Sequence, residues 1–222
     1  MNCRTLSLLV GPLLAAACGQ SAESNNLARN DTPKNVAEIL TSQPARPVGN
    51  GPFGLTMGQS ESSLDLDTGT QGGPAEARLL RSVPRPVQEF ETYAAVAQPD
   101  VGLCEIRAVS RVFESDSYGH NVKSAMDAMA DLLDSRYGDH RKLDNCSDYN
   151  CEFFQQNLRS GSQVYSYEWS ARTGARLAHG VGEIILVAMP GEFNRTFFRL
   201  DYLSANREGC EAARTRSRAS AL

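Results

Sequence analysis

The sequence lacks the features of two large classes of protein. Its longest apolar run, Leu6 to Ala17, is about twelve residues long, and a transmembrane helix needs ~20. Positive charge is not in surplus, because 22 Lys and Arg stand against 26 Asp and Glu. Sequence-independent binding of nucleic acid depends on surplus Lys and Arg at the phosphates. We therefore expect no membrane-spanning helix and no nucleic-acid partner.

Residue patterns that carry catalysis are also scarce. The three histidines, His120, His140 and His179, each lie beside Gly or Asp in an expected loop or helix boundary. No serine occupies a Gly-x-Ser-x-Gly turn, and Gly72-Gly73 is not followed by the Lys-Ser/Thr of a phosphate-binding loop. These absences favour a protein that is not an enzyme and has no cofactor. The alternative is a hydrolase in which His120 or His140 works with a carboxylate.

The first 17 residues have the pattern of an export signal, with Arg4, the apolar run and then small residues. The string Leu14-Ala-Ala-Ala-Cys18-Gly19 resembles the lipobox of bacterial lipoproteins, whose cysteine receives a diacylglycerol before cleavage. This resemblance implies a lipid anchor on Cys18 with acyl chains such as palmitate. By the same resemblance, Gly19, in a position where Asp would signal retention in this family, implies the outer membrane facing the periplasm. The alternative is a secreted protein that is cleaved within the alanine run.

Composition divides the remaining chain into three parts. Residues 18–50 are poor in bulky apolar side chains, so we expect the lipidated cysteine to be followed by a disordered tether. Residues 51–211 are expected to form one domain, and residues 212–222 a short, basic, disordered tail. The opening Phe53-Gly-Leu-Thr-Met-Gly58 resembles that of assorted small envelope proteins, many of them uncharacterised.

Alternation and helical spacing predict an α+β domain. Its antiparallel sheet would contain a hairpin and a C-terminal three-strand meander, with one main amphipathic helix, 121–137, packed on a face. In the second hairpin arm, Cys104, Ile106 and Ala108 are expected to share a face. The methionines of the helix have the spacing of core residues. Candidate strands are 77–83, 90–97 and 103–113, then 163–171, 183–188 and 193–205, and a short second helix is expected at 151–158.

The cysteines of an exported chain predict two disulfides. Cys3 leaves with the signal and Cys18 takes the lipid, which leaves Cys104, Cys146, Cys151 and Cys210. Three pairings are open. Spacing favours a small ring between Cys146 and Cys151 and a long staple between Cys104 and Cys210. Metal binding is the rival interpretation, but the ligand spacing of a zinc or calcium site is missing.

One strand has binding character. Tyr165, Tyr167 and Trp169 alternate along residues 163–171 and so share one face, where they could stack on sugar rings or pack in the core. We expect a non-enzymatic accessory protein that binds an envelope protein or peptidoglycan. A small-ligand carrier that uses this aromatic face is a further alternative.

Overall fold

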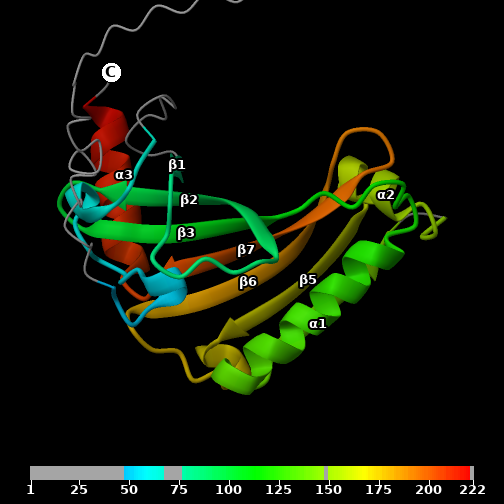
Figure 1. Ribbon diagram of the computed structural model, residues 1–222, viewed down its shortest axis with the longest axis horizontal. Coiled ribbons are helices and arrows are strands. Elements are labelled where there is room, and N and C mark those ends of the chain that lie inside the picture. Colours follow the sequence, from blue (N-terminus) through cyan, green and yellow to red (C-terminus); the bar gives the residue numbers. More distant parts are fainter. Residues whose placement is uncertain (1–47, 68–76, 148–149, 221–222) are drawn as a thin grey trace, which may run out of the picture. The chain divides into compact units, whose positions relative to one another are not determined.

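The computed structural model describes residues 48–67, 77–147 and 150–220. The expected signal, Cys18 and most of the tether lie outside the described residues. The fold is built on a seven-stranded antiparallel sheet with the strand order β1-β2-β3-β7-β6-β5-β4 (Figure 1). The strands are β1 (Arg78–Leu80), β2 (Phe90–Gln98), β3 (Gly102–Ser110), β4 (Arg141–Cys146), β5 (Gln163–Ser170), β6 (Val181–Pro190) and β7 (Thr196–Ser204).

Three α-helices accompany the sheet in the described part of the chain: α1 (His120–Tyr137), α2 (Phe154–Ser160) and α3 (Arg207–Ala219). Helix α1 runs along the sheet in Figure 1, and α3 stands beside the ends of β2 and β3. Tyr137 of α1 contacts Tyr202 of β7, whereas the next residue, Leu203, lines a pocket under α3. Since neighbouring strand residues point to opposite faces, α1 and α3 cover opposite faces. The predicted α+β class, with an antiparallel sheet, is confirmed.

The core lies between the sheet and α1. Strand register aligns Trp169 with Ile184 and Ile184 with Tyr202, and all three side chains are buried. From α1, the expected core methionines Met126 and Met129 are buried against the same face. Apolar residues at helical spacing in α1 and at alternate positions in the strands therefore face each other and form one apolar layer. Its other buried members from the helix are Val122, Ala130, Leu133 and Tyr137.

Strand β4 corrects one expectation, since residues 141–146 are polar and were expected in a loop. All six residues of β4 pair antiparallel with β5, from Arg141 opposite Glu168 to Cys146 opposite Gln163. Their side chains are mostly exposed, as charged residues of an edge strand usually are. Backbone pairing and the disulfide of Cys146 hold this strand, and neither leaves a hydrophobic pattern in the sequence.

Helix α3 corrects the expected disordered tail, because residues 212–219 continue a helix that begins at Arg207. Asn206 caps its start, and its side-chain oxygen accepts a hydrogen bond from the Gly209 amide at 3.2 Å. Ala213 is its only buried residue. An isolated helix of this length is marginal in water, so contacts with the sheet must hold it in place.

Both disulfides join the cysteine pairs that spacing favours. Cys104 and Cys210 have Cα atoms 5.8 Å apart and lie 106 residues apart in sequence. Cys146 and Cys151 have Cα atoms 5.9 Å apart and close a ring between residues five apart. The first bond joins β3 to α3, and the second joins the end of β4 to the segment before α2. The folded chain therefore has one long-range and one local covalent link.

We predict that the two links differ in what they contribute to stability. In the chain-entropy model, losing the long link through Cys104→Ser/Cys210→Ser costs about 4.7 kcal/mol of unfolding free energy. Losing the local link through Cys146→Ser/Cys151→Ser costs about 2 kcal/mol. Urea unfolding of both double variants measures the difference. Equal losses would contradict the assigned roles.

Candidate functional site

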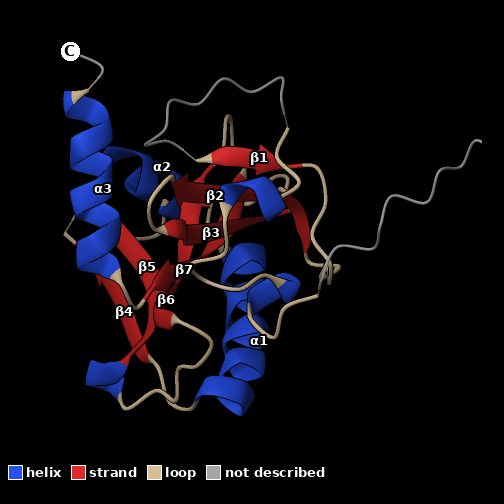
Figure 2. Cartoon of the chain, turned by 90° about the vertical axis from the view of Figure 1, so that its left-hand side faces the viewer, coloured by secondary structure: helices blue, strands red, loops and turns tan. Residues whose placement is uncertain are grey.

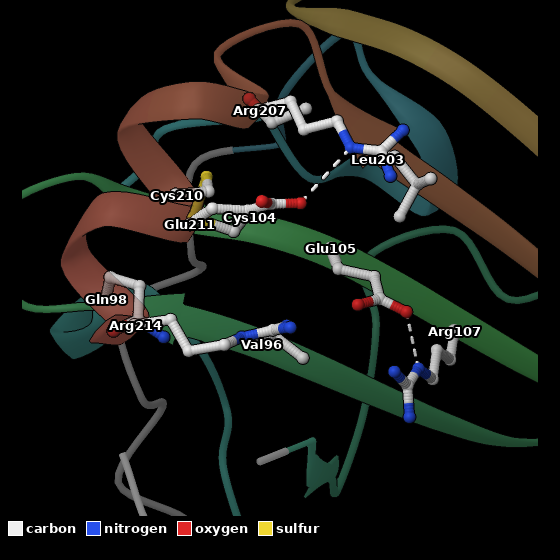
Figure 3. Close-up of a pocket in the computed structure, with 11 residues that line it drawn as sticks. Val96, Gln98, Cys104, Glu105, Arg107, Leu203, Arg207, Cys210, Glu211 and Arg214 are labelled. Carbon is white, nitrogen blue, oxygen red and sulfur yellow. Dashed lines mark hydrogen bonds and ion pairs between the residues drawn. A yellow bond between two sulfur atoms is a disulfide. The ribbon is translucent and has the colours of Figure 1, made fainter. Parts of the chain in front are cut away.

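A pocket of about 220 Å³ with both charged and apolar lining residues lies between α3 and the sheet (Figure 3). Its floor comes from β2, β3 and β7, and its wall from α3. The Cys104–Cys210 disulfide forms part of the lining. The remaining lining residues are Val96, Gln98, Glu105, Arg107, Leu203, Ser204, Arg207, Glu211 and Arg214. This pocket combines a short apolar surface with several charged groups.

A β-bulge gives the pocket its floor. Val96 of β2 pairs with Glu105, but the next residue of β2, Ala97, pairs with Leu103. Cys104 is therefore the extra residue, and its sulfur reaches Cys210 of α3. The simple alternation that places Cys104 with Ile106 and Ala108 is wrong, because the bulge turns its side chain to the α3 face.

Paired charges cover the floor and the sheet beside it. Arg107 donates through Nε to Glu105, and that hydrogen bond raises the pKa of the arginine. Arg199 donates to both oxygens of Asp201 at 2.8 to 3.0 Å. Burial raises the pKa of the Asp201 carboxyl, although Arg199 acts in the opposite direction. Glu105 and Asp201 are thus buried acids, and each has an arginine partner two residues away along its own strand.

The α3 wall presents a row of long polar side chains. Arg207, Cys210, Glu211 and Arg214 fall at helical spacing of three, four and seven, so they share the face toward the sheet. Arg207 pairs with Glu183 at 3.2 Å and with Glu211 at 3.3 Å. Arg214 is half-buried and makes no hydrogen bond or ion pair with any residue that the structure describes. This row is not predicted from the sequence, in which residues 212–222 are expected to form a tail.

The aromatic residues singled out for binding lie in the core instead. Tyr165, Tyr167 and Trp169 are almost completely buried under α1. Their ring faces are covered, so this row is not available as the binding surface proposed from sequence. The physical reason is that a sheet packed on a helix needs bulky side chains on its inner face.

Acidic residues of α1 accept hydrogen bonds from the polar tips of this aromatic row. Both tyrosine hydroxyls donate to Asp127, that of Tyr165 at 2.9 Å. The indole of Trp169 donates to Asp134 at 2.9 Å and to the Gly138 carbonyl at 3.0 Å. Burial raises the pKa of Asp127, but the bonds from Tyr167, Tyr165 and Lys142 outweigh it and lower the pKa overall. These carboxylates fix how α1 sits on β5.

One histidine meets a carboxylate, as the hydrolase alternative requires. His140 Nδ1 lies 2.9 Å from Asp134 Oδ1, and its ring packs edge-on against Tyr167 and Trp169. Asp134 also holds the Trp169 indole. No described serine or cysteine hydrogen-bonds to this histidine. The pair therefore contains a base and the carboxylate that would orient it. Both residues also belong to the hydrogen-bond network that holds Trp169.

Exposed aromatic side chains gather at the α2 end of the domain. Tyr118 and Phe153 are 51% and 44% exposed, and their rings stack with centroids 6.2 Å apart. Phe193, 81% exposed, lies in the β6–β7 turn. That turn is joined to the loop of Tyr118 by the hydrogen bond from Asp116 N to Asn194 O, at 2.8 Å. We call Tyr118, Phe153 and Phe193 the aromatic tip.

The backbone at the tip is unusual as well. Phe193 has a φ of 45°, a left-handed conformation that residues with a Cβ rarely adopt. Gln155 and Arg159 of α2 both donate to the Gly191 carbonyl, Gln155 at 2.9 Å, and so anchor the turn to α2. In Figure 1 the β3–α1 loop, α2 and the β6–β7 turn meet at this end. The strained turn is thus held in place with its phenylalanine pointing to solvent.

Comparison of the chain with family models, with curated proteins and with solved structures finds no match. Among the residues described, no three His, Cys, Asp or Glu side chains form a group that could hold a metal ion. No helix in the described ranges is long and apolar enough to cross a membrane. Function must therefore be argued from the pocket and the aromatic tip.

We predict that Trp169→Ala destabilises the domain strongly, because it empties a fully buried core position and removes a hydrogen bond to Asp134. The expected loss is about 3–5 kcal/mol of unfolding free energy. Chemical denaturation followed by far-ultraviolet circular dichroism measures it. A variant with unchanged stability would show that the indole contributes little to the core and would reopen the binding role of the row.

We also predict that Asp127→Asn weakens the domain and alters its response to acid. A lowered carboxyl pKa contributes stability above the ordinary carboxyl range, and this contribution disappears as pH falls through the lowered pKa. The variant should lose about 1 kcal/mol at neutral pH and lack this part of the acid sensitivity. Denaturation across the acidic range tests it, with Asp131→Asn, an exposed neighbour on α1, as the control. Identical pH profiles for wild type and Asp127→Asn would refute the assignment.

Proposed function

We propose that the chain is a lipid-anchored protein of a bacterial envelope. It binds a partner through its aromatic tip and is not an enzyme. The lipobox-like string ending at Cys18 supports the anchor. Two disulfides in the folded domain support an oxidising compartment, because such bonds persist mainly outside the reducing cytosol. The observation that carries the binding role is the cluster of exposed aromatic rings, since such residues are enriched at protein interfaces.

The position of the aromatic tip fits this role. Residues 48–67, cyan in Figure 1, lie toward the end of the domain that carries α3, whereas α2 and the β6–β7 turn lie toward the other end. A lipid anchor on Cys18 would be joined to the domain through this segment. The tip is then free to contact an envelope protein or the wall, and an outer-membrane anchor would place that contact on the periplasmic side.

The hydrolase alternative has one supporting observation, the His140–Asp134 pair at 2.9 Å. A general base oriented by a carboxylate needs a nucleophile or water at its other nitrogen. His140→Gln removes the imidazole base, and a hydrolase that uses it should lose nearly all turnover on an envelope substrate. Wall fragments and ester substrates serve as probes. Turnover that is present in the wild type and absent in the variant would favour the enzyme over the binding protein.

The anchor is tested by metabolic labelling with a palmitate analogue. We expect the wild type to incorporate the label and to fractionate with membranes, whereas Cys18→Ala is unlabelled and released in soluble form. Equal labelling of the two proteins would place the lipid elsewhere. A wild type without label would remove the lipoprotein interpretation.

The aromatic tip is tested by cross-linking and affinity recovery of the detergent-extracted protein. We expect a stoichiometric envelope partner whose recovery falls at least tenfold with Tyr118→Ser/Phe193→Ser. The control is Leu132→Ser, which removes an apolar side chain of α1 that is also well exposed but belongs to no tip loop. Equal recovery with the tip variant and the control would show that the partner uses another surface.

A further inference from the structure

The pocket under α3 carries an inference separate from the envelope role. Three arginines and two glutamates line it: Arg107, Arg207 and Arg214, with Glu105 and Glu211. The lining therefore has one positive charge in excess. Arg207 and Arg107 each have an acidic partner, so the excess belongs in practice to Arg214.

Arg214 is placed to act on a ligand. It is half-buried on the sheet-facing side of α3, and no described residue pairs with its guanidinium. Figure 3 shows its side chain extending from α3 over Val96 toward the Glu105–Arg107 pair. A guanidinium offers five donors in a planar fork, and a half-buried one without an acceptor gains most from an anion that enters the pocket.

The second donor group is Arg107. Its Nε is bonded to Glu105, but its terminal amino groups donate to no residue within the described ranges. Glu105 is itself buried, and the ion pair keeps Arg107 in one orientation at the pocket floor. An anion beside Arg214 can therefore also receive hydrogen bonds from a positioned arginine.

The charge and size of the pocket select the kind of anion. A phosphate monoester carries nearly two negative charges at neutral pH, and two glutamates in the lining would repel the second charge. A carboxylate carries one charge, which matches the excess, and its two oxygens fit an arginine fork. The volume of about 220 Å³ is many times the ~15 Å³ that a single bound water needs. That is room for a carboxylate with a short body.

Apolar groups determine what the body of the ligand can be. Val96, Leu203 and the Cys104–Cys210 disulfide lie in the lining beside the charged groups. A short aliphatic chain attached to the carboxylate would cover them and remove their surface from water. A bare inorganic anion would leave this surface wet.

We propose that the α3 pocket binds the carboxylate of a small aliphatic acid or of a peptide C-terminus, held by Arg214 and Arg107. The two sources share one chemistry, a single carboxylate on a short apolar body. Binding depends on α3 remaining bonded to β3, because the wall of the pocket is the helix itself. The site is independent of the lipid anchor and of the aromatic tip.

Isothermal titration of the full chain tests the site. One arm uses short aliphatic acids such as butyrate, and the other uses an alanine tripeptide with a free or an amidated C-terminus. We expect saturable binding of at least one carboxylate probe, no binding of the amidated peptide, and weaker binding of inorganic phosphate. The stronger of the two carboxylate probes identifies the source.

The variant Arg214→Gln should weaken carboxylate binding by about tenfold or more, since it removes a charged hydrogen-bonding partner. Its thermal unfolding should match the wild type, because Arg214 contacts no other described side chain through hydrogen bonds or ion pairs. Arg216→Gln is the matched control on the same helix: Arg216 is exposed and lies 3.7 Å from Asp100, outside the pocket. This control should bind as tightly as the wild type.

Three results would overturn the proposal. The first is the absence of heat and of saturation with every carboxylate probe. The second is equal affinity in wild type and Arg214→Gln. The third is phosphate binding that is as tight as carboxylate binding, because the two glutamates would then have no influence on selectivity.

Discussion

The bond between Cys104 and Cys210 is the constraint on which the polar side of this structure depends. Helix α3 buries only Ala213 and is otherwise held by side-chain contacts such as Arg207 to Glu183 and Ser217 to Gln98. Exposed ion pairs of this kind contribute little. The covalent link between two residues 106 apart in sequence therefore holds α3 on the sheet, because apolar packing does not. It keeps a polar helix over a charged sheet face and so creates the pocket between them.

The two faces of the sheet are stabilised in different ways. Under α1, the aromatic row of β5 is buried, and its polar tips reach Asp127 and Asp134, which lie two turns apart on the same side of α1. Buried hydroxyl and indole groups would be costly without such acceptors. Under α3, buried acids pair with arginines of their own strands, Glu105 with Arg107 and Asp201 with Arg199. Charge on this face is neutralised locally, which leaves Arg214 as the lining arginine that pairs with no described residue (Figure 3). Helices α1 and α3 lie on either side of the strands in Figure 2.

The sequence predicted the elements whose pattern is hydrophobic. Strand β5 was expected at 163–171 and is found at Gln163–Ser170, and the helix expected at 121–137 is His120–Tyr137. Both bury one face, so their periods appear in the residues. Strand β4 and helix α3 were missed because backbone pairing, a cap and disulfides hold them. None of these constraints leaves an apolar repeat in Arg141–Cys146 or in residues 212–219.

The candidate site was harder to predict for the same reason. Alternation placed Cys104 on the wrong face, since a bulge cannot be read from residue types alone. The tyrosines and the tryptophan that suggested binding were needed for the core. The residues that do face a pocket, Arg107 and Arg214, come from a strand and from the supposed tail. Arg107 and Arg214 come together only because α3 forms: the helix places Arg214 on the same face as Cys210, and Cys210 is bonded to β3.

The central claim is that the long disulfide holds α3 on the sheet. Hydrogen–deuterium exchange of the wild type and of Cys210→Ser measures it directly. The account predicts that amides of Arg207–Ala219 lose their protection in the variant while those of β5, β6 and β7 keep theirs. Unchanged protection of α3 in the variant would contradict it, and would show that noncovalent contacts alone are enough to form the pocket.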